Sequence, residues 1–328
     1  MTKLKLPRRG FLHLAAGAAA LPIASRLASA QTYPSRRVHV VAVYAPGGFS
    51  DLFARMAAQW LSDRLGQQFV VENRSGGGGN IGTESVVKAD PDGYTLLLAD
   101  ISHAFNATLF DNLRFNFIRD IVPVASIFRG ASVLLVHPSV PARTVPEVIA
   151  YAKANPGKIT MGSAGIGSIP HMCGELFNTM AGLNIVQVQY RGAAPALIDM
   201  LGGQTQITFA TLPSSIQYIQ TDKLRPLAVT STTRLEALPD IPPMADFIPG
   251  YEVTSWTGIG APKGTPTEIV EMLNREINAA LAEPSVKARF VELGGKALPG
   301  TPGDFARFIA EEVEKWGKVI KAAGIKAE

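Results

Sequence analysis

One stretch near the start of the chain constrains the fold more than any other. Residues 38–43 are mostly β-branched and apolar, which predicts a buried strand, and Pro46-Gly47-Gly48 then ends the strand in a tight turn. Ser50 or Asp51 can cap the helix that follows, in which apolar residues recur at helical spacing as far as Leu61. Because the first N–H groups of a helix have no partner within it, this order of elements suits the binding of an anion.

A second stretch of the same kind lies in the middle of the chain. Residues 159–162 predict a strand, and Ser163-Ala164-Gly165-Ile166-Gly167-Ser168 predicts a turn. Pro170 then suits the first turn of a helix that continues to Met180. The two turns can face each other across a cleft, although each alone is also compatible with a plain strand-to-helix connection.

Length and charge set broad limits. The 328 residues suggest two domains, and the apolar fraction of 47% is enough to give each one a core. The formal net charge of +4 comes from the first thirty residues, which hold five basic residues and no acid. Without them, 26 basic residues stand against 27 acidic ones, a charge of −1. The charge therefore does not indicate a nucleic-acid partner, and none is predicted.

The first thirty residues are typical of an export signal. Arg8-Arg9-Gly10-Phe11-Leu12 resembles a twin-arginine motif, with Pro7 in place of the usual Ser or Thr. An Ala-rich apolar segment of about a dozen residues follows, too short to span a membrane easily. Ala28-Ser29-Ala30 then fits a cleavage site before Gln31. We expect residues 1–30 to be a signal peptide removed on export to the periplasm, and a retained membrane anchor is the alternative.

A glycine-rich run gives the chain a formal match to a dinucleotide-binding motif. Gly77, Gly79 and Gly82 have the G-x-G-x-x-G spacing, and Asp100 falls about where a ribose-binding acid would. However, the helix after the run has room only for residues 81–89, and the glycines do not start at the tip of the preceding strand. A structural loop is the better interpretation, and we predict that neither NAD nor any other cofactor binds.

No constellation of side chains indicates catalysis or a metal site. Cys173 is the single cysteine, so no intrachain disulfide can form, and its place on a predicted helix favours a small buried side chain. His171 lies only two residues away and cannot face it on a helix. His103 has no other metal-binding residue at ligand spacing, and Ser163 and Ser168 do not lie in a G-x-S-x-G motif. The chain is therefore not predicted to be an enzyme.

Strands and helices alternate along the rest of the chain, which favours a parallel, doubly wound α/β sheet. Ligands collect at the carboxyl ends of strands in such sheets, where Ser102 follows a strand predicted over residues 95–99. Other strands are predicted over residues 68–72, 131–136, 186–190, 207–210, 227–230 and 256–261, and helices over residues 193–201, 267–282 and 304–323.

Eight short segments cover nearly the whole chain after residue 30 in a fixed order. They are Ala45-Pro46-Gly47-Gly48-Phe49-Ser50-Asp51 and residues 72–82, 91–96, 151–158, 162–171, 190–196, 224–231 and 256–266. No segment is specific alone, but the ordered set resembles one family, the Bug or tripartite tricarboxylate transporter receptors. These are extracytoplasmic solute-binding proteins.

This resemblance implies an α/β fold of the two-lobed periplasmic-binding-protein type (type II, Venus flytrap). Each lobe is expected to hold a mixed, mostly parallel sheet flanked by helices. Lobe 1 is expected to comprise residues 31–130 and 231–328 and lobe 2 residues 131–230, with crossing segments near residues 127–134 and 228–232. The lobes are expected to close around the ligand by a hinge motion.

The resemblance also implies what is bound and how. The ligand is expected to be a small carboxylate (a di- or tricarboxylate or a related organic acid), held by backbone N–H groups and bridging water without an arginine clamp. Phe49, Ser50 and Ile166 fill variable positions and are expected to select the ligand. The expected ligand-binding residues, taken from the two turns and from the sheet edge, are Gly47, Gly48, Phe49, Ser50, Asp51, Ser102, Ser163, Ala164, Gly165, Gly167, Ser168 and Thr211.

The expected function is that of a monomeric periplasmic receptor. It would capture the carboxylate and deliver it to the membrane subunits of a tripartite tricarboxylate-type transporter. A ligand-presenting sensor for a membrane kinase would use the same fold, and the neighbouring genes would distinguish the two. An NAD-dependent oxidoreductase that uses Gly77, Gly79 and Gly82 is the remaining alternative.

Overall fold

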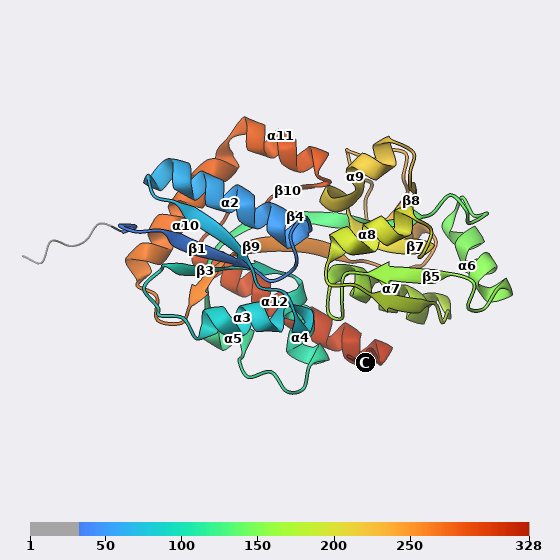
Figure 1. Ribbon diagram of the computed structural model, residues 1–328, viewed down its shortest axis with the longest axis horizontal. Coiled ribbons are helices and arrows are strands. Elements are labelled where there is room, and N and C mark those ends of the chain that lie inside the picture. The colour runs from blue at the N-terminus through green and yellow to red at the C-terminus, as the bar shows by residue number, and fades with distance from the viewer. Residues whose placement is uncertain (1–32, 328) are drawn as a thin grey trace, which may run out of the picture. The chain divides into compact units, whose positions relative to one another are not determined.

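Strands and helices largely alternate in the computed structural model, which describes residues 33–327 (Figure 1). The predicted signal peptide and its cleavage site lie outside these residues. The strands are β1 (Val38–Ala42), β2 (Phe69–Asn73), β3 (Thr95–Asp100), β4 (Ile121–Val136), β5 (Thr160–Ser163), β6 (Val186–Gln189), β7 (Ile207–Thr211), β8 (Arg225–Val229), β9 (Thr254–Pro262) and β10 (Gly295–Ala297). The helices are α2 (Phe49–Leu65), η2 (Gly77–Gly79), α3 (Asn80–Val87), α4 (Ser102–Leu109), α5 (Phe117–Asp120), α6 (Val145–Ala154), α7 (Ile169–Ala181), α8 (Ala193–Leu201), α9 (Leu212–Gln220), η3 (Met244–Asp246), α10 (Thr267–Ala282), α11 (Pro284–Glu292) and α12 (Pro302–Ala323).

The strands form one mixed sheet with the order β2-β1-β3-β9-β4-β7-β5-β6, while β8 and β10 each pair with β4. Pairing is parallel within β2-β1-β3 and within β7-β5-β6. The long strands β4 and β9 pair antiparallel with their neighbours and with each other. The sheet is therefore mixed because two long strands join two parallel groups.

Strand β4 connects the two halves of this sheet. It pairs with β9 as far as Ala131, and from Ser132 on it pairs with β7 and β8. Thr230 fixes this crossing, because its hydroxyl accepts the N–H of Ser132 at 2.9 Å and donates to the carbonyl of Val253 at 2.6 Å. We call the part built on β1, β2, β3, β9 and β10 lobe 1 and the part built on β5 to β8 lobe 2.

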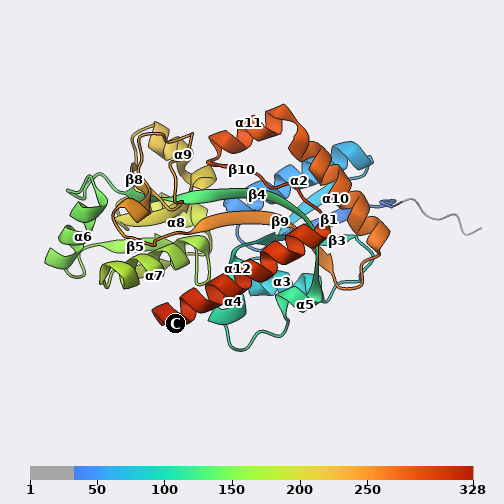
Figure 2. The ribbon, with the colours of Figure 1, turned by 180° about the vertical axis from the view of Figure 1, so that it is seen from behind.

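Helices cover both faces of the sheet in lobe 1. α2 and α11 lie on one face, and α3, α4, α5 and α12 lie on the other, as both views show (Figures 1 and 2). Four aromatic rings, including Phe49 and Phe53 of α2 itself, pack together where α2 covers the sheet. The ring centroids are 4.5 Å apart for Phe53 and Phe128 and 5.7 Å apart for Phe53 and Phe290. Phe49 joins this cluster at 5.0 Å from Phe53, which holds the first residue of α2 firmly in the core.

Some elements differ from the sequence-based predictions. β4 begins at Ile121, ten residues before the predicted start at residue 131. Its pairing with β9 shifts register twice in this early part, between Pro123 and Ala125 and between Ser126 and Phe128. α9 and α11 were not predicted, although Pro213 and Pro284 both suit the first turn of a helix. Among residues 33–327, no helix is both long enough and apolar enough to cross a membrane.

Candidate functional site

A cavity lies where the carboxyl ends of the two groups of parallel strands meet. β1 and β3 run toward lobe 2 while β5 and β7 run toward lobe 1, so the turns after these strands converge. The cavity has a volume of about 40 Å³, which is room for a few water molecules. It is lined by Tyr44, Gly48, Phe49, Ser50, Asp100, Ser102, Ala164, Ser168, Ile169, Pro170, Ala193, Ala196, Leu197, Thr208, Phe209, Ala210 and Thr211.

Five helices begin at this cavity. Ser50 lies in the first turn of α2, Ser102 and Ile169 are the first residues of α4 and α7, Ala193 is the first residue of α8, and Thr211 is the N-cap of α9. Each helix start offers N–H groups without an intrahelical partner and the positive end of a helix dipole. None of the lining residues is Lys, Arg or His, so no side chain of the lining carries a positive charge.

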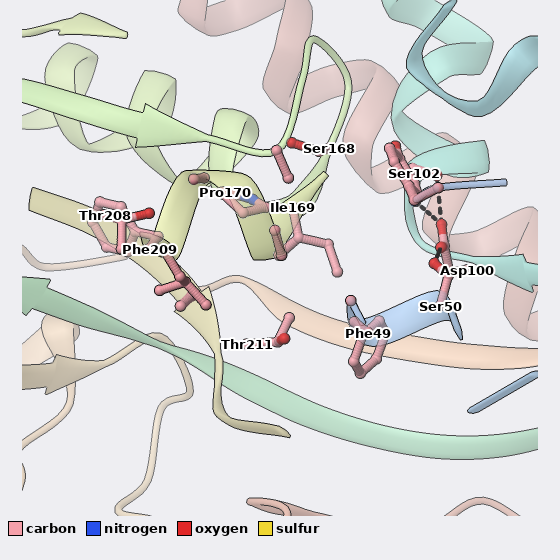
Figure 3. Close-up of a pocket in the computed structure, with 17 residues that line it drawn as sticks. Phe49, Ser50, Asp100, Ser102, Ser168, Ile169, Pro170, Thr208, Phe209 and Thr211 are labelled. Carbon is pink, nitrogen blue, oxygen red and sulfur yellow. Dashed lines mark hydrogen bonds between the residues drawn. The ribbon is translucent and has the colours of Figure 1, made fainter. Parts of the chain in front are cut away.

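On the lobe 1 side, three polar side chains form a hydrogen-bonded group (Figure 3). The hydroxyls of Ser50 and Ser102 both donate to the carboxylate of Asp100, which also accepts the backbone N–H of Ser102 at 3.0 Å. Asp100 is only 1% exposed. Burial alone would raise its pKa, but the His103 imidazole, 3.6 Å away, and the two hydroxyls outweigh burial and lower the pKa. Asp100 is therefore a buried, ionised carboxylate in the cavity wall.

On the lobe 2 side, polar groups belong to helix caps and strand ends. Ser168 is the N-cap of α7, and its hydroxyl accepts the N–H of His171 at 3.4 Å. The hydroxyl of Thr208 donates to the carbonyl of Gly162 at 2.7 Å. Ile169, Pro170 and Phe209 make the rest of this side largely apolar (Figure 3), together with Leu197. This wall contains no ionisable side chain.

The cavity brings together seven of the predicted site residues. Phe49 presents its ring to the cavity from the aromatic cluster of lobe 1, 6.0 Å between its centroid and that of Phe128. The seven residues are Gly48, Phe49, Ser50, Ser102, Ala164, Ser168 and Thr211.

Gly47 and Asp51 do not line the cavity. The carboxylate of Asp51 accepts the N–H of Gly47 at 3.0 Å and the side-chain amide of Asn73 at 2.9 Å, and it pairs with Arg55. Burial would raise the pKa of Asp51, but these partners lower it. The prediction that Ser50 or Asp51 caps α2 is wrong, because the helix begins at Phe49 with the backbone of Gly48 at the N-cap.

Ser163, Gly165 and Gly167 lie next to the cavity. The buried hydroxyl of Ser163 is 3.5 Å from that of Ser168. Gly165 borders a second hollow of about 510 Å³, which also includes Arg191. Gly167 lies so close to Asn106 of lobe 1 that a Cβ there would be 2.2 Å from its Oδ1. The turn after β5 is therefore pressed against lobe 1 in this structure.

Sequence reasoning missed several lining residues. Asp100 had a visible signal, since it ends a predicted strand at the ligand-binding edge, but it was considered only as a ribose-binding acid. The predicted helix over residues 193–201 likewise begins at the cavity. The residues missed are Tyr44, Asp100, Ile169, Pro170, Ala193, Ala196, Leu197, Thr208, Phe209 and Ala210.

The glycine-rich run forms a short 3₁₀ turn followed by α3, which is only eight residues long. A Cβ on Gly78 would lie 2.7 Å from the carbonyl oxygen of Ile166 in lobe 2 and 3.1 Å from Phe110. Gly78 has a φ of +67°, a left-handed conformation that favours glycine. These glycines allow a close approach between the lobes. Among residues 33–327, no group of three His, Cys, Asp or Glu side chains is arranged to hold a metal ion.

Comparisons with known proteins agree with this geometry. The family described as the tripartite tricarboxylate transporter family receptor (TctC) matches residues 53–325. Protein BugT of Bordetella pertussis is 36% identical over 301 residues, which cover 91% of this chain and 92% of BugT.

Solved structures show the same fold. Rpa4515 of R. palustris, solved with adipate, is 38% identical with a TM-score of 0.87, and the match covers 90% of this chain and 99% of that one. The periplasmic binding protein BugD is 33% identical with a TM-score of 0.87, over 90% of this chain and all of BugD. MatC of Rhodopseudomonas palustris, solved with malate, is 29% identical with a TM-score of 0.84, over 88% of this chain and all of MatC. The chain therefore belongs to the TctC or Bug family, whose members are two-lobed solute-binding receptors and not enzymes.

Proposed function

We propose that this protein is a receptor that captures a small organic carboxylate and delivers it to a membrane transporter. The observation that carries the proposal is the meeting of five helix starts at one cavity that no cationic side chain lines. Such backbone groups are suited to a carboxylate. Two similar proteins were solved with adipate and with malate, which supports the same ligand chemistry here.

We also propose where the receptor works and how it moves. Export would remove residues 1–30 and leave a monomer in the periplasm. Lobe 1 would comprise residues 31–130 and 231–328, and lobe 2 residues 131–230. Because the cavity has a volume of only about 40 Å³, a carboxylate would enter while the lobes are apart and would be enclosed when they close.

A thermal-shift screen of the mature protein (residues 31–328) tests the proposal. Small carboxylates would be compared with their neutral amides and alcohols of the same carbon chain. A carboxylate at 100 times its dissociation constant should add about 2.7 kcal/mol to the free energy of unfolding. If no carboxylate raises the melting temperature while a neutral analogue does, the proposed ligand class is wrong.

A further inference from the structure

The cavity wall contains one ionised side chain, and it is an acid. Asp100 lies on the lobe 1 side, 1% exposed, and no Lys, Arg or His stands among the lining residues. Its nearest basic group, Nδ1 of His103, is 3.6 Å away behind the wall. A receptor for a carboxylate therefore carries a buried carboxylate of its own at one end of the cavity.

The hydroxyls beside Asp100 cannot serve as donors to an incoming anion. A serine hydroxyl has one proton, and Ser50 and Ser102 both give theirs to Asp100 (Figure 3). What these oxygens can still offer is lone pairs. Tyr44, the other polar side chain of this wall, donates its hydroxyl to the carbonyl of Gly78 at 3.2 Å. The side chains that line this wall therefore offer an incoming group only acceptors, and the one that is ionised is an acid.

Asp100 itself has room for one more donor. A carboxylate offers about four acceptor sites, and Asp100 accepts three hydrogen bonds, from the Ser50 hydroxyl and from the hydroxyl and N–H of Ser102. An ammonium or amide group would supply the fourth. A second ionised carboxylate in this place would instead meet the like charge of a buried carboxylate at short range, which is unfavourable.

The two ends of the cavity differ in this respect. The negative charge of Asp100 lies at the starts of α2 and α4 and offsets the positive ends of their dipoles. The starts of α7, α8 and α9 in lobe 2 have no such acid in the lining. Lobe 2 is thus the end that favours an anion, and lobe 1 is the end that favours a donor.

We propose that the ligand is a carboxylate whose far end carries an N–H donor, an ammonium or an amide, and that Asp100 selects for this end. The inference rests on the proposed function and narrows it, because it disfavours the di- and tricarboxylates expected from the family resemblance. In the bound state the carboxylate lies toward the starts of the lobe 2 helices and the N–H group donates to Asp100.

Calorimetry with chain-matched ligands tests this inference. Each set would contain a dicarboxylate, its monoamide and the amino acid of equal chain length, such as adipate, adipamate and 6-aminohexanoate, or glutarate, glutaramate and 5-aminopentanoate. The wild-type protein should bind the N–H member of at least one set at least about tenfold more tightly than the dicarboxylate of that set. This comparison needs no variant, so it stands even if a substitution of the buried Asp100 prevents folding.

Asp100→Asn then assigns the preference to one residue. It should reduce the preference for the N–H member about tenfold or more and tighten binding of the dicarboxylate. Asp199→Asn is the matched control: it removes one negative charge from lobe 2, where Asp199 accepts from Tyr190 at 2.7 Å outside the lining. The control should keep the wild-type preference.

The outcomes separate the two proposals. Tighter binding of the dicarboxylates by the wild-type protein, or an unchanged preference in Asp100→Asn, would overturn the role of Asp100 and leave the receptor function intact. If no carboxylate of any set binds, the proposed function itself fails.

Discussion

The polar groups of the two cavity walls are of different kinds: side chains in lobe 1 and mainly helix starts in lobe 2. In lobe 1, Ser50, Asp100 and Ser102 form a closed group in which both hydroxyl protons are already used. In lobe 2, the polar groups are the starts of α7, α8 and α9 beside apolar side chains. A site for an anion can therefore be built without a cationic side chain, provided that no acid of the protein occupies the helix starts.

The two glycine turns also differ in whether an acid of the protein accepts their backbone N–H groups. Both follow a strand and precede a helix, and both look suited to an anion in the sequence. In the first turn, however, the carboxylate of Asp51 takes the N–H of Gly47. The turn that ends at Ser168 contains no acid, so no carboxylate of this turn occupies the start of α7.

The largest expected effect on carboxylate affinity comes from a single acidic substitution in the lobe 2 wall. Ala193→Asp places a carboxylate at the start of α8, where it should raise the free energy of unfolding by about 0.3–1 kcal/mol. Carboxylate binding should weaken by at least about a hundredfold, because the new carboxylate repels the ligand and occupies its place. Melting temperature and calorimetry would be measured together.

Ser285→Asp is the control for this experiment, since it adds the same charge to the first turn of α11, on the surface. Its affinity should equal that of the wild-type protein. Wild-type affinity in Ala193→Asp would contradict the assignment of the anion to lobe 2.

A smaller effect is expected at Ser168, where capping and ligand binding coincide. Ser168→Ala should lower the free energy of unfolding by about 1 kcal/mol, since the cap on the N–H of His171 is lost. A lost hydrogen bond to a charged ligand should weaken binding about ten- to a hundredfold. Ser168→Gly separates the two roles, because glycine at an N-cap costs only a few tenths of a kcal/mol.

Thr144→Ala provides the matched control, since Thr144 caps α6 in the same way but is not among the lining residues. It should lose stability and keep its affinity. Full affinity in Ser168→Gly would show that the Ser168 hydroxyl is a cap alone.

The smallest effect concerns His171 of α7, which lies outside the lining. Burial lowers the pKa of its imidazole to about 4. The unfolded chain then binds more protons than the folded protein between about pH 6.5 and 4, so stability is full above this range and falls as the pH drops. From pH 7.5 to 5.5 this one group should cost about 1.4 kcal/mol.

Urea unfolding of the wild-type protein and His171→Gln at the two pH values measures this contribution. The variant should lose about 1.4 kcal/mol less than the wild-type protein over this interval. Equal losses in the two proteins would mean that His171 does not titrate as its burial requires.

Much of the fold follows from local patterns in the sequence. The helix predicted over residues 267–282 is present with the same bounds as α10, because its apolar residues keep one helical stripe over its full length. The turn from Ser163 to Ser168 was also predicted. Its conformation depends on residues close together in the sequence, namely the apolar strand before it, its glycines and the proline in the first turn of α7.

What the sequence did not reveal depends on partners far apart in the chain. The early half of β4 is stabilised by pairing with β9, more than a hundred residues later. Asp51 looked like a ligand residue until the structure showed it bound to Gly47, Asn73 and Arg55. The place of Asp100 in the cavity wall could not be predicted either, because Ser50, which donates to its carboxylate, lies on a different element, α2.

A crystal structure of the mature protein with its best-binding carboxylate would show which helix starts hold the anion. We predict that the carboxylate lies between the lobes, with an oxygen within about 3.2 Å of the Ser168 hydroxyl or of a backbone N–H at the start of α7, α8 or α9, and with no Lys or Arg in contact. A carboxylate bound instead by Arg191 in the second hollow would contradict the assignment of the anion to the helix starts of lobe 2.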